Sequence, residues 1–173
     1  MPKLKFTLKA WPVIALATIG LCYLTQTVAD WLGVELSEQQ NVELVRWCCS
    51  HAFDSGRHFA SFVFVIAQIV ILAPAIEECL FRFASRLAWK RLALWGALCT
   101  ILSAVFSFVH YPDYPQVLKT HALVLKPLDN AFVALFFFGI AQCWLYRRTG
   151  RLWCAILNHG LFNLTNLLLL PLV

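Results

Sequence analysis

Charged residues are scarce in this sequence. Asp, Glu, Lys and Arg make up 13% of its 173 residues, whereas 61% are hydrophobic and the mean hydropathy is +0.72. In soluble domains about a quarter of all residues are charged and about half are apolar. The composition therefore argues against a soluble protein and favours a membrane protein. The chain also lacks repeats and low-complexity linkers, and its length suits one compact bundle, so we predict a single domain over 1–173.

Motifs that would indicate a metal or redox site are missing as well. The seven cysteines form no C-x-x-C motif, and Cys48 and Cys49 are simply adjacent. Cysteines scattered through apolar helices behave as small buried hydrophobes. No H-E-x-x-H zinc motif is present either. We therefore expect no metal and no cofactor.

The scarcity of charge leaves five long uncharged runs. They have 20, 18, 21, 17 and 22 residues and cover 10–29, 59–76, 92–112, 130–146 and 152–173. A membrane-spanning helix needs about 20 apolar residues, with a range of about 17–25. We therefore predict an all-α, multi-pass transmembrane helical bundle of about five spanning helices. The first run has no evident cleavage site before Asp30 and is long for a signal peptide, so we expect it to remain a helix.

Basic residues lie at the ends of the predicted helices. They cluster near the N-terminus, at 82–91 and at 147–151. Basic residues at helix ends are typical of a protein that lies in a lipid bilayer. The net charge of +5 is therefore not a sign of nucleic-acid binding. The positive-inside rule predicts that the N-terminus and the turns near 86–91 and 147–151 are cytoplasmic.

The second apolar run raises a question of topology. From 59 to 89 the chain stays mostly apolar, with Pro74 in the middle. A proline can kink a transmembrane helix, or it could turn the chain back and give two short spans. The second arrangement would move the basic residues at 86–91 to the outer side, which the positive-inside rule disfavours. We therefore predict one long helix, kinked at Pro74.

The connecting segments are less regular. Residues 41–53, NVELVRWCCSHAF, could form a short interfacial helix. The segment 111–129 contains three prolines and is expected to be a loop or a shallow surface segment. Gly150 is expected to close a tight turn between the last two spanning helices.

Ionisable residues within the predicted spans are few. Each costs about 2.5–3.5 kcal/mol on insertion scales, so each is a candidate functional residue. Glu78 and Arg82 are four residues apart on a helix and can form an ion pair. Glu77 lies on a neighbouring face without a local cation. Glu77 is therefore the carboxylate that is free to act as a general base.

The remaining candidates lie on two later helices. His110 ends the third helix and is either an interfacial or a catalytic residue. His159 and Asn163 share one face, and Gly160 allows a neighbour to approach closely. This pair is either an interhelical hydrogen-bond seam or part of a site. Counted along the helices, Glu77, His110 and His159 lie roughly 20, 28 and 12 Å from their cytoplasmic turns. This counting leaves open whether the three residues meet.

Three motifs occur in order, each on its own hydrophobic helix: EECLFR (77–82), FSFVH (106–110) and HGLFN (159–163). The pattern resembles the CAAX protease and bacteriocin-processing (CPBP, or Abi) family of glutamate-dependent intramembrane proteases, over about residues 60–170. The stretch LYRRTGRLWCAILNHGLFN is also similar to the family's lead-in to its last motif. Phe83 departs from the family, which often has glycine there, and five helices are fewer than many members have.

The resemblance implies an intramembrane endopeptidase and a role for each motif residue. Glu77 would activate a water molecule, and His110 would hold or polarise that water. His159 and Asn163 would stabilise the oxyanion, while Glu78 and Arg82 would orient the site.

The resemblance also implies a membrane-associated protein or peptide as substrate, such as a prenylated tail, a bacteriocin leader or a sorting signal. The short chain suggests a bacterial enzyme of the cytoplasmic (inner) membrane. Two other functions stay open. The glutamates and histidines could bind zinc in a zinc-dependent membrane protease. Alternatively, the chain could be a non-enzymatic peptide-binding or immunity protein, or a proton-linked carrier.

Overall fold

Helices form all the regular structure of the described residues, which confirms the all-α prediction. The computed structural model describes residues 2–36, 40–110 and 129–169. Its α-helices are α1 (Pro2–Leu32), α2 (Gln40–Ser50), α3 (Gly56–Ala67), α4 (Ala73–Ser85), α5 (Leu92–Val109), α7 (Ala131–Thr149) and α8 (Leu152–Leu169). A π-helical turn, η1 (Gln68–Leu72), joins α3 to α4, and a 3₁₀ turn, η2 (Arg86–Ala88), follows α4.

Four helical segments in the described part of the chain are long and apolar enough to cross a membrane. They are Pro2–Leu32, Gly56–Ala88, Leu92–Val109 and Leu152–Leu169. The fifth predicted span forms α7. The mean hydropathy of α7 is lower than that of these four segments, because Arg147 and Arg148 lie in its last turn. Helix α7 is nevertheless central, and much of its length is buried between the other helices.

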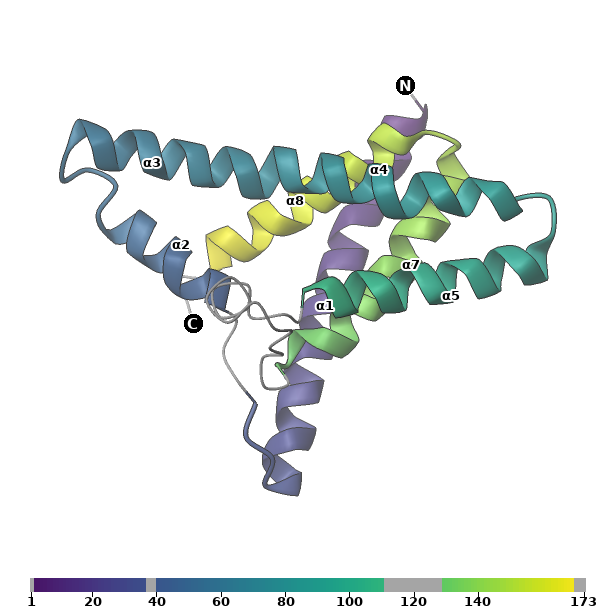
Figure 1. The fold of residues 1–173 in the computed structure, drawn as a ribbon, viewed down its shortest axis with the longest axis horizontal. Coiled ribbons are helices and arrows are strands. Elements are labelled where there is room, and N and C mark those ends of the chain that lie inside the picture. Colours follow the sequence, from purple (N-terminus) through teal and green to yellow (C-terminus); the bar gives the residue numbers. More distant parts are fainter. Residues whose placement is uncertain (1, 37–39, 111–128, 170–173) are drawn as a thin grey trace, which may run out of the picture.

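The chain does not turn back at Pro74. Residues Gly56–Ala88 form one continuous helical segment, and Figure 1 shows α3 and α4 following one another along it. The irregularity predicted at Pro74 takes the form of the π-helical turn η1, which ends just before the proline.

Both terminal helices pack onto other elements, α1 against α7 and α8, and α8 against α4 and η1.

The proline explains a contact between this segment and α8. In η1 the N–H of Ala73 donates to the carbonyl of Gln68, five residues earlier. In this register the next donor would be Pro74, which has no N–H. The carbonyl of Ile69 therefore lacks a partner in its own helix, and the side-chain amide of Asn163 donates to it at 2.9 Å.

Helix α4 directs its ion pair into the bundle and its large apolar side chains outward. Glu78 and Arg82 are fully buried. The opposite face is apolar, with Ile76, Leu80 and Phe83 exposed by 60%, 64% and 56%. A soluble protein would show the reverse arrangement, whereas in a bilayer the outer apolar face contacts lipid.

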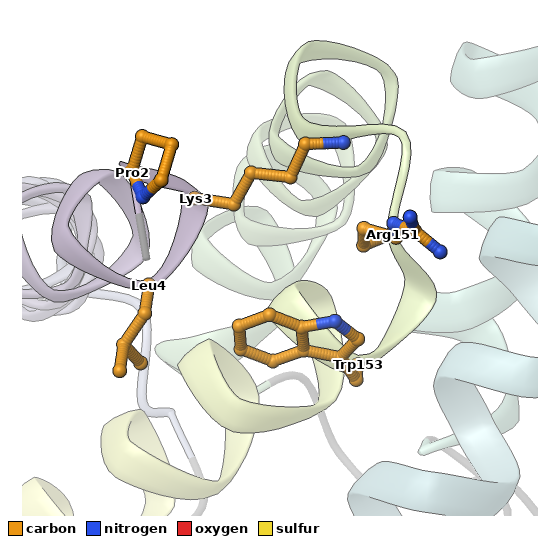
Figure 2. A pocket seen from close by; sticks show the side chains of 5 residues that line it. All are labelled: Pro2, Lys3, Leu4, Arg151 and Trp153. Atoms are coloured by element: carbon orange, nitrogen blue, oxygen red, sulfur yellow. The ribbon is translucent and has the colours of Figure 1, made fainter.

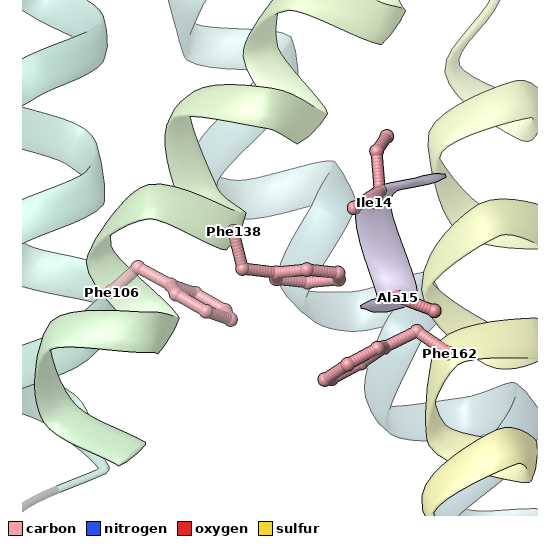
Figure 3. Packing of buried hydrophobic residues seen from close by; sticks show 5 residues of the cluster. All are labelled: Ile14, Ala15, Phe106, Phe138 and Phe162. Carbon is pink, nitrogen blue, oxygen red and sulfur yellow. The ribbon is translucent and has the colours of Figure 1, made fainter. Parts of the chain in front are cut away.

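Aromatic rings from three helices form the centre of the core. Phe106 of α5, Phe138 of α7 and Phe162 of α8 pack together and meet Ile14 and Ala15 of α1. Figure 3 shows the three rings converging. The Phe138 and Phe162 ring centroids are 4.5 Å apart, and those of Phe106 and Phe138 are 6.4 Å apart, within the usual range for aromatic pairs.

The predicted cytoplasmic turns lie next to each other. Arg147 donates to the carbonyl of Trp89 at 3.3 Å, and its guanidinium lies 4.4 Å from the centre of the Trp95 ring. Gly150 has the positive φ of 64° expected in a tight turn, and its N–H donates to Tyr146. The side of the membrane on which these turns lie stays a prediction.

Two predicted connecting segments have different outcomes. Helix α2 corresponds to the short helix predicted at 41–53. The predicted loop at 111–129 lies outside the described residues except for its last residue.

The close approach of α8 to η1 predicts a position-dependent effect of alanine. An ideal Cβ on Gly160 would clash with the carbonyl oxygen of Val70, whereas nothing lies within 4 Å of one on Gly96. Gly160→Ala should therefore destabilise the fold by about 1–3 kcal/mol through overpacking. Gly96→Ala should be neutral or stabilising by up to about 1 kcal/mol. Thermal unfolding of both variants in detergent measures the difference, and equal midpoints would contradict the close contact.

Candidate active site

Glu78 lies at the centre of a buried charged cluster. Its Oε1 atom is 2.8 Å from Nδ1 of His159, and its Oε2 atom is 2.9 Å from Nε of Arg82. The carboxylate and the guanidinium are completely buried, and only 5% of the His159 side chain is exposed. The ion pair predicted between Glu78 and Arg82 is thus present. The contact with His159 joins two motifs 81 residues apart, which the helical spacing alone could not predict.

Glu77 lies between two histidines. Its Oε1 atom is 3.9 Å from Nε2 of His110, and its Oε2 atom is 3.6 Å from Nε2 of His159. The side chain of Glu77 is 24% exposed and that of His110 is 33% exposed. The adjacent glutamates therefore have different surroundings, since Glu78 is buried and paired whereas Glu77 is partly exposed.

Hydrogen bonds orient both imidazole rings. Nδ1 of His110 lies 2.7 Å from the carbonyl oxygen of Phe106. A carbonyl only accepts, so this nitrogen must carry the proton. In the same way, Nδ1 of His159 donates to the carboxylate of Glu78 when that group is ionised. Both rings consequently present Nε2 to Glu77.

Phe106 and Phe138 fix the position of the charged and imidazole groups. The Phe106 ring lies 4.8 Å from that of His110 and 6.0 Å from that of His159, and the Arg82 guanidinium lies 4.8 Å from its centre. Phe138 contacts His159 edge to face at 4.9 Å. Such contacts favour the cation and hold the rings. Sequence reasoning did not identify Phe138, because three consecutive phenylalanines at 136–138 give no sign of which one faces inward.

Asn163 has a contact that the sequence did not suggest. It lies one turn beyond His159 on α8, and its amide donates to the carbonyl of Ile69 in η1. Asn158, which precedes His159 in the sequence, is buried and accepts a hydrogen bond of 2.8 Å from Gln142 of α7. Gln142 was also absent from the predicted site residues, since a single glutamine in an apolar run gives no motif.

The structure brings together residues whose predicted depths differed. Counting along each helix assumed that the helices are parallel. Figure 1 instead shows α8 crossing the α3–α4 segment obliquely, and α8 packs against α4 and η1. His159 therefore reaches Glu77 although it lies closer to its own turn in residue count.

A cavity of about 330 Å³ lies elsewhere, between the first turns of α1 and α8. Figure 2 shows its five lining side chains, Pro2, Lys3, Leu4, Arg151 and Trp153. None of them belongs to the carboxylate–histidine cluster, so the cavity is separate from the candidate active site. The described part of the chain contains no group of three or more His, Cys, Asp or Glu arranged to hold a metal ion.

Comparison with known families gives one result. The family model described as type II CAAX prenyl endopeptidase Rce1-like matches residues 59–165. The match covers more than half of the chain and includes all three motifs, which confirms the resemblance seen in the sequence. No curated protein and no solved structure matches the chain.

The buried cluster predicts that Arg82 is needed for folding. Arg82→Met would leave the Glu78 carboxylate buried without its cation, which typically costs about 3–5 kcal/mol. Arg86→Met, at an exposed arginine of the next turn, should change stability by less than about 0.5 kcal/mol. The measurement is thermal unfolding of both variants in the same detergent. A midpoint for Arg82→Met equal to that of Arg86→Met would contradict the ion pair.

Proposed function

The chain belongs to the Rce1-like family of type II CAAX prenyl endopeptidases, and we propose that Glu77 activates the water molecule that cleaves its substrate. The substrate in this proposal is a membrane-associated peptide or protein tail. The family supports a membrane-embedded peptidase in general. The mechanism below is our inference from the geometry of the site.

The observation that carries the proposal is the placement of Glu77 between the Nε2 atoms of His110 and His159. The 3.9 Å between Glu77 and His110 is too long for a direct hydrogen bond. A water molecule bridging the two groups suits this separation. Glu77 would accept one proton of that water, and the unprotonated Nε2 of His110 would accept a hydrogen bond from the other.

The reaction then follows with ordinary acid–base chemistry. The oxygen of the activated water attacks the peptide carbonyl carbon and forms a tetrahedral intermediate. The C–N bond breaks, and the proton held by Glu77 moves to the departing nitrogen. The products are a new carboxyl terminus and a released peptide with a free amine.

His159 and Asn163 are the proposed donors to the oxyanion. When the His159 ring carries both protons, Nδ1 donates to Glu78 and Nε2 can donate outward. The contact between Asn163 and Ile69 uses one amide proton, and the amide has a second. Glu78 and Arg82 would orient His159. Donors held in place within an apolar bundle stabilise developing negative charge more strongly than donors in water.

The proposed location is the bacterial cytoplasmic membrane, with the N-terminus in the cytoplasm. The three basic segments that support this orientation lie close together. Arg147 contacts Trp89 of the turn near 86–91, and Lys3 of the N-terminal segment lies near Gly150 of the turn near 147–151. In this proposal the substrate is held in the bilayer and reaches the site through Glu77 and His110, whose side chains are partly exposed.

Glu77→Gln should abolish cleavage without unfolding the protein. Loss of a general base typically lowers the rate about 10²–10⁴-fold, and Glu77 is partly exposed, so its neutral replacement should leave the unfolding temperature nearly unchanged. Membrane peptides from a deletion strain complemented with wild type or variant can be compared by mass spectrometry. Glu35→Gln, at an exposed carboxylate outside the site, serves as the control. Undiminished cleavage by folded Glu77→Gln would refute the proposal.

Variants of the oxyanion donors separate an enzyme from a binding protein. His159→Gln and Asn163→Ala should still bind a peptide that accumulates in the deletion strain, but they should cleave it at least about 100-fold more slowly. Binding by both variants in proteoliposomes is measured beside the cleavage rate. A wild-type protein that binds such a peptide and never cleaves it would favour the non-enzymatic function.

A further inference from the structure

Four fully buried polar side chains lie next to the candidate active site, and the proposed chemistry does not use three of them. They are Arg82 of α4, Ser103 of α5, Gln142 of α7 and Asn158 of α8. Each lies one helical turn from a residue of the charged or aromatic cluster. Counted from a starting residue in the cluster, the four steps are Glu78 to Arg82, Phe106 to Ser103, Phe138 to Gln142 and Phe162 to Asn158.

Along its own helix, each of the four side chains lies one turn closer than its starting residue to the turn near 86–91 or to the turn near 147–151. The steps from Glu78 to Arg82 and from Phe138 to Gln142 run forward along the chain. The steps to Ser103 and Asn158 run backward, because α5 and α8 begin at these turns. We call these four residues, Arg82, Ser103, Gln142 and Asn158, the polar layer.

Contacts between the helices agree with this placement. Gln142 donates to Asn158 at 2.8 Å. The Arg82 guanidinium lies over the Phe106 ring, one turn from Ser103. Ser103 packs so closely against Gly139 that an ideal Cβ there would lie 2.8 Å from its hydroxyl. Gly139 is one turn from Gln142, so the layer connects all four helices.

The polar layer contains both donors and acceptors without a protein partner. The donors are Nη1 and Nη2 of Arg82 and Nδ2 of Asn158, the acceptor is Oε1 of Gln142, and the Ser103 hydroxyl can do either. Buried polar groups in native proteins are nearly always hydrogen-bonded to protein or to ordered water.

We propose that the polar layer is a binding site for internal water. A water molecule both donates and accepts, so it can join the guanidinium and the Asn158 amide to the Gln142 and Ser103 oxygens. A metal cation would be repelled by Arg82. An anion would satisfy the donors, the Ser103 hydroxyl among them, but would face the unpaired Oε1 of Gln142, which can only accept. Water is therefore the ligand that fits the whole set.

The bound water gives Gln142 and Asn158 a role as positioning residues. It would fix the guanidinium of Arg82, which in turn holds Glu78 against His159. This consequence for catalysis rests on the proposed function, whereas the water site itself does not.

An experimental structure of the wild-type protein at about 2 Å resolution tests the site directly. Ordered solvent should lie within hydrogen-bonding distance of an Arg82 Nη atom and of Gln142 Oε1 or Ser103 Oγ. Direct bonds among the four side chains, with no solvent between them, would overturn the proposal. This test is independent of whether the protein cleaves any peptide.

A double-mutant cycle tests the site in solution. Gln142→Met and Asn158→Leu should each lower the unfolding temperature in detergent. Suppose that these two side chains served only to bond each other. The double variant would then unfold at a higher temperature than either single variant, because removing both partners of a hydrogen bond is nearly neutral. We expect no such recovery, since Nη1 and Nη2 of Arg82 still lack an acceptor in the protein. Recovery in the double variant would overturn the water site. Gln26→Met, at an amide bonded to Asp30 and Asn130 outside the layer, is the control.

The positioning role has its own readout. Once a cleaved peptide is identified, folded Gln142→Met should lower kcat about tenfold with KM unchanged, because the change affects alignment of the site and not substrate binding. An unchanged kcat would overturn the positioning role and leave the structural test of the water site unaffected.

Discussion

The buried carboxylate of Glu78 is the constraint on which the site depends. A charge inside a bilayer protein is tolerated only with close partners, and Glu78 has two, Arg82 on its own helix and His159 on α8. Satisfying this one carboxylate brings α8 against α4, orients the His159 ring and directs its second nitrogen toward Glu77. The neighbouring glutamate is thereby left partly exposed in a site that is already assembled.

The backbone reinforces the same helix contact. Pro74 and the preceding π-helical turn leave the Ile69 carbonyl without a donor, and Asn163 of α8 supplies one. One turn of α8 away, Gly160 allows the Val70 carbonyl to come close. The irregular part of the long helix is therefore matched to α8, where Asn163 and Gly160 lie beside His159. This agrees with the rule that freed backbone groups in membrane helices are satisfied by neighbouring helices.

The adjacent glutamates show how one helix separates two tasks. Residues 77 and 78 differ by about 100° around the helix axis, so one side chain faces the interior and the other faces the edge of the bundle. The same division explains the rest of α4, with buried charge on one face and exposed Ile76, Leu80 and Phe83 on the other. If α4 were shifted by one residue along its axis, Glu77 would be buried, and Glu78, the partner of Arg82, would be exposed.

The sequence alone was sufficient for the helical class, the membrane setting and the family, and it predicted the ion pair between Glu78 and Arg82. Uncharged runs reflect the cost of polar groups in lipid, and i, i+4 spacing is a local property, so both can be read from the chain. The contacts between helices could not be. Whether Glu77 meets both histidines, which of three phenylalanines faces His159, and whether Asn163 contacts η1 all depend on how the helices cross. Crossing is decided by side-chain packing and by unpaired backbone and charged groups on separate helices, and only the tertiary structure brings these together.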